Sequence, residues 1–231
     1  RSRRRNTEWT SDWCSDVCSS DLVDRLFGDW EPGTGIVKAG TSGGVAVEHI
    51  QQETSQTQIG IAYPSVVYRH DEYFSAFGAV GVLSGGMSAR LFTEVREKRG
   101  LCYSVYASHH TLRDQASVMC YAGTSSDRAQ ETLEVTLGEL SRLAEGVFPD
   151  ELDRVKARIK SALIMQHESP SSRSASVARY WYHLGRVCSF EEVHQRVDRL
   201  GCDDITDHLG RYPAKDYTIV TLGPQPLDMP S

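Results

Sequence analysis

The segment Leu83–Tyr106, which reads LSGGMSARLFTEVREKRGLCYSVY, constrains the fold more than any other part of the chain. Two adjacent glycines, Gly85 and Gly86, end an apolar run, because glycine allows a sharp turn without steric cost. Apolar residues at helical spacing then predict a helix with Ser88 as its N-cap and Gly100 as its stop. Beyond Gly100 the apolar period changes from helical to two. The segment is therefore predicted to be a turn, a helix, a glycine stop and a strand.

The side chains of this segment divide into two faces in each element. On the helix, the face expected to be in water carries Arg90, Glu94, Glu97 and Lys98, and the apolar stripe carries Leu91, Phe92 and Val95. On the strand, one face is expected to carry Tyr103, Val105 and Ala107 and the other Ser104, Tyr106 and Ser108. This arrangement places Arg96 near the helix end and Tyr103 at the strand entry, with a tight corner between them. Residue types alone allow an ordinary interpretation, with Arg96 in a solvated basic cluster and Tyr103 half-buried in a sheet.

The same string closely resembles a segment of the pitrilysin/insulinase family of zinc metallopeptidases, in the processing-peptidase-like branch. In that family a Gly-Gly turn and an RLF string lead into REKRGL-x-YSVY, as they do here. The resemblance implies that the segment belongs to the C-terminal homologous domain, the half that holds no zinc. It also implies that Arg96 and Tyr103 reach the active site of the other half and hydrogen-bond the bound peptide.

Partners and cofactor follow from this resemblance. It implies that the zinc ion lies in a missing N-terminal half and that this chain binds none. The expected partners are a peptide substrate and the zinc-bearing domain, either in the same polypeptide or in a partner subunit.

Composition sets broader limits. The chain has 231 residues, of which 39% are apolar and 24% charged, as expected for one or two soluble domains. We expect no membrane segment, because no run approaches about 18 apolar residues, and no nucleic-acid partner, because the net charge is −6. Six cysteines without CxxC pairs favour structural thiols over a disulfide framework. Without a visible leader, these features favour the cytoplasm.

The chain divides into three predicted parts. Residues 1–22 have no apolar period and resemble a translated sequencing adaptor, with a native disordered tail as the alternative. Residues 23–44 are predicted to hold half a helix, Val23 to Trp30, that ends at Gly28, followed by a linker rich in Gly, Pro, Thr and Ser. The resemblance identifies this part as the end of the preceding N-terminal domain. The resemblance implies that residues 45–231 form the C-terminal peptidase-homology domain.

The spacing of apolar residues, together with glycine, proline and helix-cap residues, predicts the strands and helices of residues 45–231. Strands are expected near 45–50, 57–63, 103–107, 116–120 and 217–223, with a hairpin turn at Arg113-Asp114. Helices are expected from a cap at Asp71 to residue 81, from a cap at Ser126 or Asp127 to 143, from Pro149 to 163, and over 171–185, 190–200 and 203–209. This order predicts an α+β fold, a two-layer sandwich with a largely antiparallel sheet covered by helices.

The chain lacks the family's catalytic signature H-x-x-E-H, which places two histidines and a glutamate on one helix turn. The nearest approaches, His49 with Glu53, His167 with Glu168 and Glu192 with His194, have the wrong spacing. His109 and His110 are adjacent on a strand and should point to opposite faces. No Gly-x-Ser-x-Gly elbow or phosphate loop occurs, and Cys102 is better explained as an apolar filler than as a nucleophile.

Two functions remain. The first is the substrate-binding C-terminal half of a zinc metalloendopeptidase, which completes the active site of the zinc-bearing half and is inactive alone. The second is a non-catalytic scaffold or assembly subunit of the same fold. Some non-catalytic partners in the family carry a long glycine-rich loop that contacts substrate, but Gly85-Gly86 is only a two-residue corner. Arg96 and Tyr103 favour the first function.

Overall fold

The computed structural model describes residues 20–31 and 46–229, and it divides the chain into a unit of residues 1–39 and a unit of residues 40–231. In the first unit a helix runs over residues 20–27 and ends in a turn, where the Gly28 amide donates to the Asp24 carbonyl at 2.6 Å. The helix predicted to end at Gly28 is therefore present, and it begins three residues inside the predicted leader. The rest of that leader and residues 32–44 of the predicted linker lie outside the described residues.

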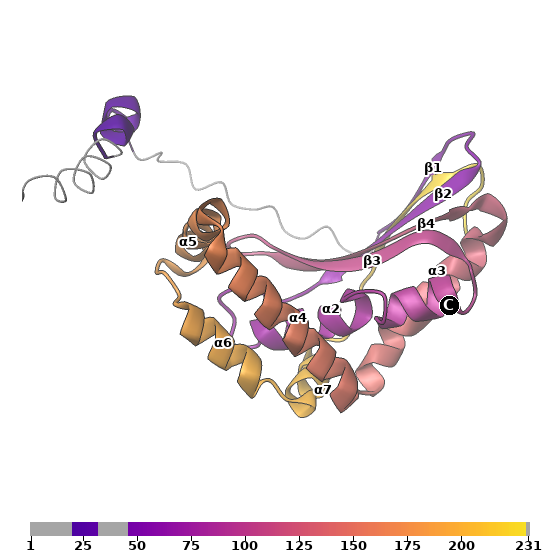
Figure 1. The fold of residues 1–231 in the computed structure, drawn as a ribbon. Coiled ribbons are helices and arrows are strands. Elements are labelled where there is room, and N and C mark those ends of the chain that lie inside the picture. Colours follow the sequence, from indigo (N-terminus) through magenta and orange to yellow (C-terminus); the bar gives the residue numbers. More distant parts are fainter. Residues whose placement is uncertain (1–19, 32–45, 230–231) are drawn as a thin grey trace, which may run out of the picture. The chain divides into compact units, whose positions relative to one another are not determined.

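A mixed sheet of five strands forms the second unit, in the order β1-β5-β2-β4-β3 (Figure 1). The strands are β1 (Ala46–Gln51), β2 (Gln56–Pro64), β3 (Cys102–Thr111), β4 (Ala116–Ser125) and β5 (Thr218–Gly223). Only β1 and β5 pair in parallel, and every other neighbouring pair is antiparallel. The hairpin between β3 and β4 closes where predicted, with the Leu112 amide donating to the Gln115 carbonyl at 2.7 Å.

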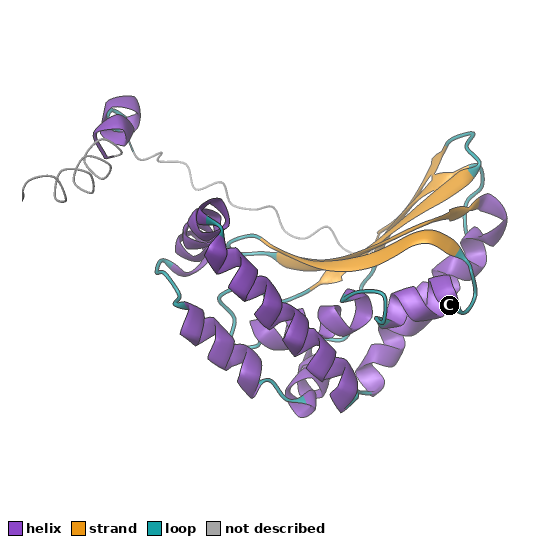
Figure 2. Ribbon diagram, viewed as in Figure 1, coloured by secondary structure: helices purple, strands orange, loops and turns teal. Residues whose placement is uncertain are grey.

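Helices cover one face of this sheet (Figure 2). They are α2 (Tyr73–Ser84), the π-helix η1 (Phe92–Glu97), the 3₁₀ turns η2 (Ser126–Arg128) and η3 (Leu143–Glu145), α3 (Ala129–Arg142), α4 (Pro149–Glu168), α5 (Pro170–Leu184), α6 (Phe190–Arg199) and α7 (Cys202–Arg211). The predicted α+β fold with a largely antiparallel sheet is confirmed. No helix in the described ranges is both long and apolar enough to cross a bilayer.

The core lies between the two layers, because buried side chains alternate with less buried ones along the strands, most regularly in β2 and β5. In β2, Ile59 and Ile61 are almost fully buried, at 1% and 2% exposure, while their neighbours are only partly covered. Small residues on α2 let helices approach it closely: a Cβ atom at Gly81 would lie 2.7 Å from the Val155 side chain of α4. Period-two alternation against a helix layer thus fixes which sheet face is buried.

The helix in the segment that follows α2 differs from the prediction. It begins at Arg90 rather than directly after Ser88, and most of it is π-helical, with the Lys98 amide bonded to the Thr93 carbonyl five residues back at 2.9 Å. Arg90 was expected on the wet face, but its side chain is only 12% exposed and forms a two-pronged ion pair with Glu151, both N–O distances being 2.7 Å. Packing against α4 therefore buries Arg90, although the helical period of the sequence placed it on the exposed face.

Two predicted caps were also wrong. α2 begins at Tyr73 with Glu72 in the cap position instead of Asp71. The helix expected from Ser126 or Asp127 starts as the 3₁₀ turn η2 and becomes α-helical only at Ala129. Pro149 does take the first position of α4, as predicted, and Gly185 ends α5 in the left-handed region at φ 67°. A cap residue contributes only about 1 kcal/mol, so tertiary contacts of similar strength can move the start of a helix. Helix ends are therefore less determined by the sequence than helix interiors.

Candidate functional site

The structure brings Arg96 and Tyr103 together at one corner of the sheet. The guanidinium carbon of Arg96, on η1, lies 5.8 Å from the centroid of the Tyr103 ring, at the start of β3. The same guanidinium lies 5.0 Å from the centroid of the Phe92 ring. Arg96 is exposed and Tyr103 is 83% exposed, so both side chains offer their donors to solvent or to a ligand.

The corner between η1 and β3 is held at its backbone. Gly100 adopts φ 61°, a conformation that a side chain disfavours, and its amide donates to the Arg96 carbonyl at 3.0 Å. The Gly100 carbonyl accepts from the Arg128 guanidinium at 2.6 Å, and the Leu101 carbonyl accepts from the Thr124 hydroxyl at 2.5 Å. Two side chains from β4 and η2 thus fix the backbone that joins the two site residues.

Tyr103 is exposed because β3 carries a bulge at this position. The strand register passes from Cys102 opposite Thr124 to Ser104 opposite Gly123, so Tyr103 is the extra residue. The sequence predicted Tyr103 on the same face as Ala107, which is buried. That expectation was wrong, because the bulge releases Tyr103 from the alternation while Cys102 remains buried.

The cations at the end of η1 are not equivalent. Glu94 accepts from Lys98 at 2.6 Å and from Arg99 at 2.9 Å, and these hydrogen bonds hold the pKa of the Glu94 carboxyl below its usual value. Arg96 forms no ion pair with any carboxylate of the described residues and lies against aromatic rings instead. Of the basic cluster predicted from the sequence, Arg96 is therefore the cation left available to a ligand.

The sheet face opposite the helices continues from this corner with polar and aromatic side chains that the sequence analysis did not single out. The rings of Tyr106 on β3 and Tyr121 on β4 lie 5.2 Å apart, and the Tyr121 hydroxyl donates to the Gln58 side chain on β2. Gly123 on β4 lies beside these side chains. A Cβ atom there would be 2.9 Å from the Tyr121 hydroxyl and 3.3 Å from the Ser104 hydroxyl.

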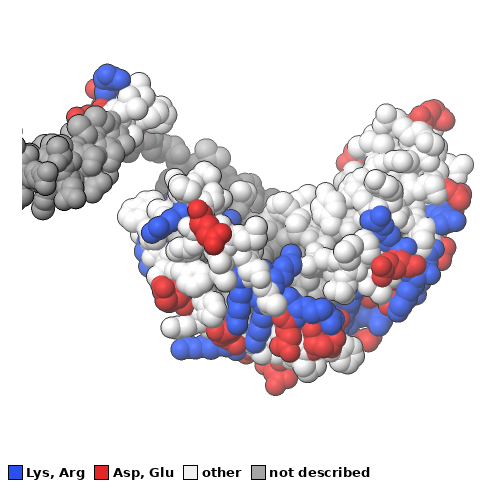
Figure 3. Space-filling view, in the orientation of Figure 1, with Lys and Arg blue, Asp and Glu red and all other residues white. Residues whose placement is uncertain are grey.

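In the sequence, Tyr121 and Gly123 alternate with the apolar Cys120 and Ala122, and this period of two was the signal that could have revealed the face. Charged side chains gather mainly over the helix layer, and the part of the surface over the sheet is mostly uncharged (Figure 3).

The described residues contain no group of three or more His, Cys, Asp or Glu side chains placed to hold a metal ion. The histidines that came nearest to a ligand pattern have other contacts. His49 bonds to the Thr221 hydroxyl at 2.9 Å, and His194 pairs with Asp198 at 3.1 Å. The described residues therefore do not form a zinc site of the kind that the resemblance places in the other half.

His109 and His110 lie on opposite faces of β3, bonded to Ser65 at 2.9 Å and to Ser108 at 2.8 Å. Burial raises the pKa of the Cys102 thiol, against a smaller opposite effect of Arg96, so the thiol is a poor nucleophile.

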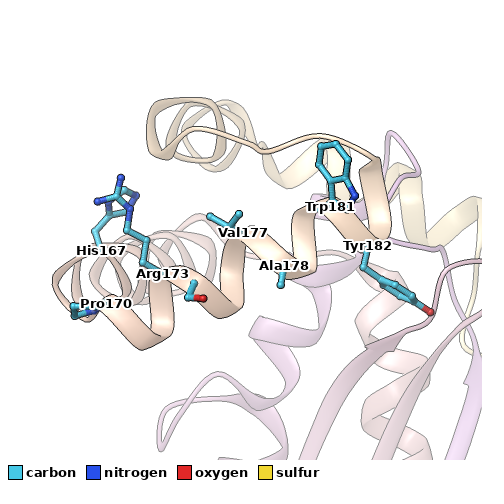
Figure 4. A pocket seen from close by; sticks show the side chains of 8 residues that line it. His167, Pro170, Arg173, Val177, Ala178, Trp181 and Tyr182 are labelled. Carbon is cyan, nitrogen blue, oxygen red and sulfur yellow. The ribbon is translucent and has the colours of Figure 1, made fainter. Parts of the chain in front are cut away.

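A groove of about 830 Å³ runs along α5, but it does not form a reactive site. The side chains that line it include Arg173, Val177, Trp181 and Tyr182, and they spread along the helix instead of converging on one point (Figure 4). The corner that holds Arg96 and Tyr103 remains the best candidate site.

Comparisons with known proteins agree with this fold. Residues 19–159 match the sequence family described as the peptidase M16 inactive domain. The chain is 28% identical over 184 residues to an uncharacterized zinc protease, YmxG, of Bacillus subtilis, covering 78% of this chain but 44% of that protein. It is 32% identical over 174 residues to an uncharacterized zinc protease of Streptomyces coelicolor, covering 73% of this chain and 38% of that protein. The chain thus spans less than half the length of these curated relatives.

Solved structures share the fold at low identity. A peptidase M16 inactive domain from Pseudomonas fluorescens superposes with a TM-score of 0.77 and 20% identity, over 87% of this chain and 48% of that chain. A chain of complex III2 from Candida albicans superposes with a TM-score of 0.74 and 18% identity, over 88% of this chain and 52% of that chain.

Proposed function

This chain belongs to the peptidase M16 inactive-domain family, and we propose that it is the substrate-binding half of a zinc metalloendopeptidase. In this proposal Arg96 and Tyr103 complete the active site of a zinc-bearing half that the chain does not contain. The zinc-protease names of relatives of which this chain covers less than half, together with a site that carries donors but no metal ligands among the described residues, support it. The observation on which it mainly rests is the exposed Arg96–Tyr103 pair, held 5.8 Å apart by a fixed corner.

The chemistry of the pair suits a peptide backbone. The Arg96 guanidinium carries five N–H donors in a rigid fork and no acceptor, and the Tyr103 phenol adds one O–H donor. A peptide chain presents carbonyl oxygens, which accept from both. When a carbonyl carbon is attacked, negative charge develops on its oxygen, and a donor positioned there stabilises the transition state by about 3 kcal/mol. The two residues therefore bind and orient the peptide, and the Tyr103 hydroxyl can donate to the developing oxyanion.

The uncharged sheet face beside the pair extends the proposed contact. Tyr106, Tyr121 and Gln58 lie on the neighbouring strands β3, β4 and β2, and the missing side chain at Gly123 lets the Tyr121 hydroxyl and the Gln58 amide lie close to its backbone. Aromatic and amide groups of this kind pack against peptide side chains and bond to a backbone without requiring charge. We propose that this face takes the part of the peptide next to the Arg96–Tyr103 pair.

The test is peptide cleavage by the full-length protein that carries this chain and a zinc-bearing half. Arg96→Ala and Tyr103→Phe are each expected to lower kcat/KM by roughly ten- to a thousandfold, as single-donor losses do in other enzymes. Arg99→Ala is the matched control, because Arg99 lies on the same helix end but is paired with Glu94 at 2.9 Å. Thermal melts of each variant separate lost activity from lost folding.

A scaffold or assembly subunit is the alternative, and the fold shared with a chain of complex III2 favours it. Unchanged cleavage by both Arg96→Ala and Tyr103→Phe would support this alternative. The cytoplasm is the proposed compartment, because Cys102, Cys120, Cys188 and Cys202 are free thiols, as is usual in a reducing compartment. Fractionation of cells that express the protein tests this assignment.

A further inference from the structure

A second cavity, of about 470 Å³, lies between α2, the far end of β3, α4 and α5. Eight of the residues that line it carry rings, namely Tyr68, Tyr73, Phe74, Phe77, His109, His110, Tyr180 and His183. The centroid of the Tyr68 ring lies 4.2 Å from that of Tyr73 and 5.1 Å from that of the His183 imidazole, on which it stacks, so flat ring faces form a large part of the walls. The cavity is about 20 Å along β3 from Tyr103, given a rise of about 3.4 Å per residue, so it is a separate site.

Two polar atoms in these walls have no partner in the protein. Nδ1 of His109 and Nδ1 of His183 are buried from solvent without a hydrogen bond to any described residue. A buried polar atom left without a partner costs free energy, and a ligand that supplied the missing hydrogen bond would recover it. Burial lowers the pKa of His109 to about 4 and also lowers that of His183, so both imidazoles are neutral at neutral pH.

The charge in this cavity is positive. None of the described residues that line it is acidic. Burial raises the pKa of Tyr68, Tyr73 and Tyr180, and the nearby Arg179 guanidinium partly opposes that rise. Burial lowers the pKa of His183, and Arg179 adds to that effect. Arg179 forms no ion pair with a described carboxylate. Arg158 also lines the cavity, but its guanidinium nitrogens lie 3.4–3.5 Å from the Cβ positions of Gly85 and Gly81 on α2. Arg179 is therefore the cation that a ligand among these rings meets.

We propose that this cavity binds a small aromatic carboxylate, with its ring among the tyrosines and its carboxylate on the Arg179 guanidinium. The volume lies within the roughly 300–1,000 Å³ of small-molecule sites. A single guanidinium matches a single carboxylate in charge and in its two-pronged geometry. The free Nδ1 atoms of His109 and His183 complete the polar contacts. Two sources have this chemistry: a free aromatic acid, and the C-terminal residue of a peptide that ends in phenylalanine.

The experiment is calorimetric titration of the 231-residue chain with 3-phenylpropionate, compared with its uncharged amide. Saturable binding of the acid, at least tenfold tighter than that of the amide, is the expected result. Arg179→Gln should weaken acid binding tenfold or more, and Arg173→Gln, on the same helix but lining the other groove, should leave it unchanged. Ala162→Trp, an exposed position of α4 on the cavity wall, should abolish binding by filling the space while leaving the melting temperature unchanged.

A tripeptide that ends in phenylalanine distinguishes the two sources. Tighter binding of the tripeptide than of 3-phenylpropionate identifies a peptide C-terminus, and the opposite order identifies a free acid. The proposal is overturned if no saturable binding occurs at millimolar concentration. It is equally overturned if acid and amide bind alike, or if Arg179→Gln and Ala162→Trp bind the acid like the unaltered chain. None of these outcomes depends on peptidase activity, so this proposal can fail while the proposed function stands.

Discussion

At the scale of single residues, exposure and pairing decide which side chains can act on a ligand. Three cations lie near the end of η1. Lys98 and Arg99 form ion pairs with the Glu94 carboxylate at 2.6 and 2.9 Å, whereas Arg96 lies against the Tyr103 ring. Tyr103 is exposed because a bulge makes it the unpaired residue of β3. The sequence indicated both positions through a resemblance that spans a short helix and a strand, and their role in binding a peptide is a proposal. It could not show the bulge, because an extra residue in one strand is defined only by the register of its partner.

Removal of the Tyr103 hydroxyl should leave folding almost unchanged. The side chain is 83% exposed, and Tyr103→Phe keeps the ring that lies beside Arg96. We expect a change in the free energy of unfolding of less than about 0.5 kcal/mol, as for other surface substitutions. Urea denaturation of the 231-residue chain measures it. A loss above about 2 kcal/mol would show that the hydroxyl has a structural role and would weaken its assignment to substrate.

The buried imidazole of His109 predicts a pH dependence of stability. Burial, with smaller effects from the charges of His208 and His110, lowers its pKa from 6.5 to about 4. The unfolded chain therefore binds a proton on this group near pH 6.5, whereas the folded chain binds it only near pH 4. The free energy of unfolding should fall as pH drops through this window, by up to about 3 kcal/mol from this group.

The test compares His109→Gln with His110→Gln in urea titrations between pH 7 and pH 4. His109→Gln removes the titrating group and should flatten the decline, while His110→Gln removes an exposed neighbour with only a smaller effect on His109 and should keep most of the slope of the unaltered chain. Equal slopes in all three proteins would contradict the assignment.

At the scale of elements, the turn between η1 and β3 positions the site, and its geometry depends on one glycine. Gly100 at φ 61° reverses the chain, and Arg128 and Thr124 hold the two carbonyls beside it. The sequence predicted this glycine stop correctly, because a left-handed residue after a helix is usually glycine. It did not predict the π-helical form of η1 or the ion pair that joins Arg90 to α4. The order and type of the elements were predictable, whereas helix caps and the exact start of η1 were not.

Gly100→Ala should destabilise the chain by about 1 kcal/mol, because a Cβ atom disfavours the left-handed region by about 1–2 kcal/mol. Gly138→Ala is the matched control: Gly138 lies inside α3, where a Cβ atom meets nothing within 4 Å. That change should stabilise the helix by about 0.5–1 kcal/mol. Chemical denaturation of the two variants should therefore give opposite signs, and a stabilising Gly100→Ala would contradict the account of the corner.

The Arg90–Glu151 pair attaches η1 to α4, and its loss should be costly. Both side chains are largely buried, at 12% and 15% exposure, and Arg90 also donates to the Gly146 carbonyl at 2.8 Å. Arg90→Ala leaves Glu151 without its partner and should destabilise the chain by about 2–3 kcal/mol. Arg154→Ala removes the exposed pair with Asp150 and should cost less than about 1 kcal/mol. Equal losses in the two variants would show that burial of the first pair does not matter.

At the scale of the whole molecule, the fold class followed from the sequence because three patterns agreed. Strands alternate with period two, helices carry one apolar face, and glycines and prolines mark most ends where the structure has them. The resemblance indicated Arg96, but the sequence did not indicate the sheet face around Gly123 as a whole, because its members come from three strands whose order is fixed only by tertiary pairing. The aromatic cavity is another such case, since its walls come from segments that lie far apart in the sequence.

The proposal also predicts where metal acts. A strong zinc chelator should leave the melting temperature of the 231-residue chain unchanged, because its described residues offer no ligand set. The same chelator should abolish peptide cleavage by the full-length protein. Stoichiometric zinc that survives dialysis of the 231-residue chain, with a melting temperature that falls on chelation, would contradict this division.

The central claim is that Arg96 and Tyr103 act together on one bound peptide, and a double-mutant cycle on kcat/KM in the full-length protein tests it most directly. The cycle consists of the unaltered protein, Arg96→Ala, Tyr103→Phe and the double variant, each with a melt to exclude unfolding. We predict that each single change lowers kcat/KM by roughly ten- to a thousandfold and that the double variant loses less than the product of the two, because donors that grip one substrate are coupled. No loss in either single variant, or losses that Arg99→Ala reproduces, would contradict the claim.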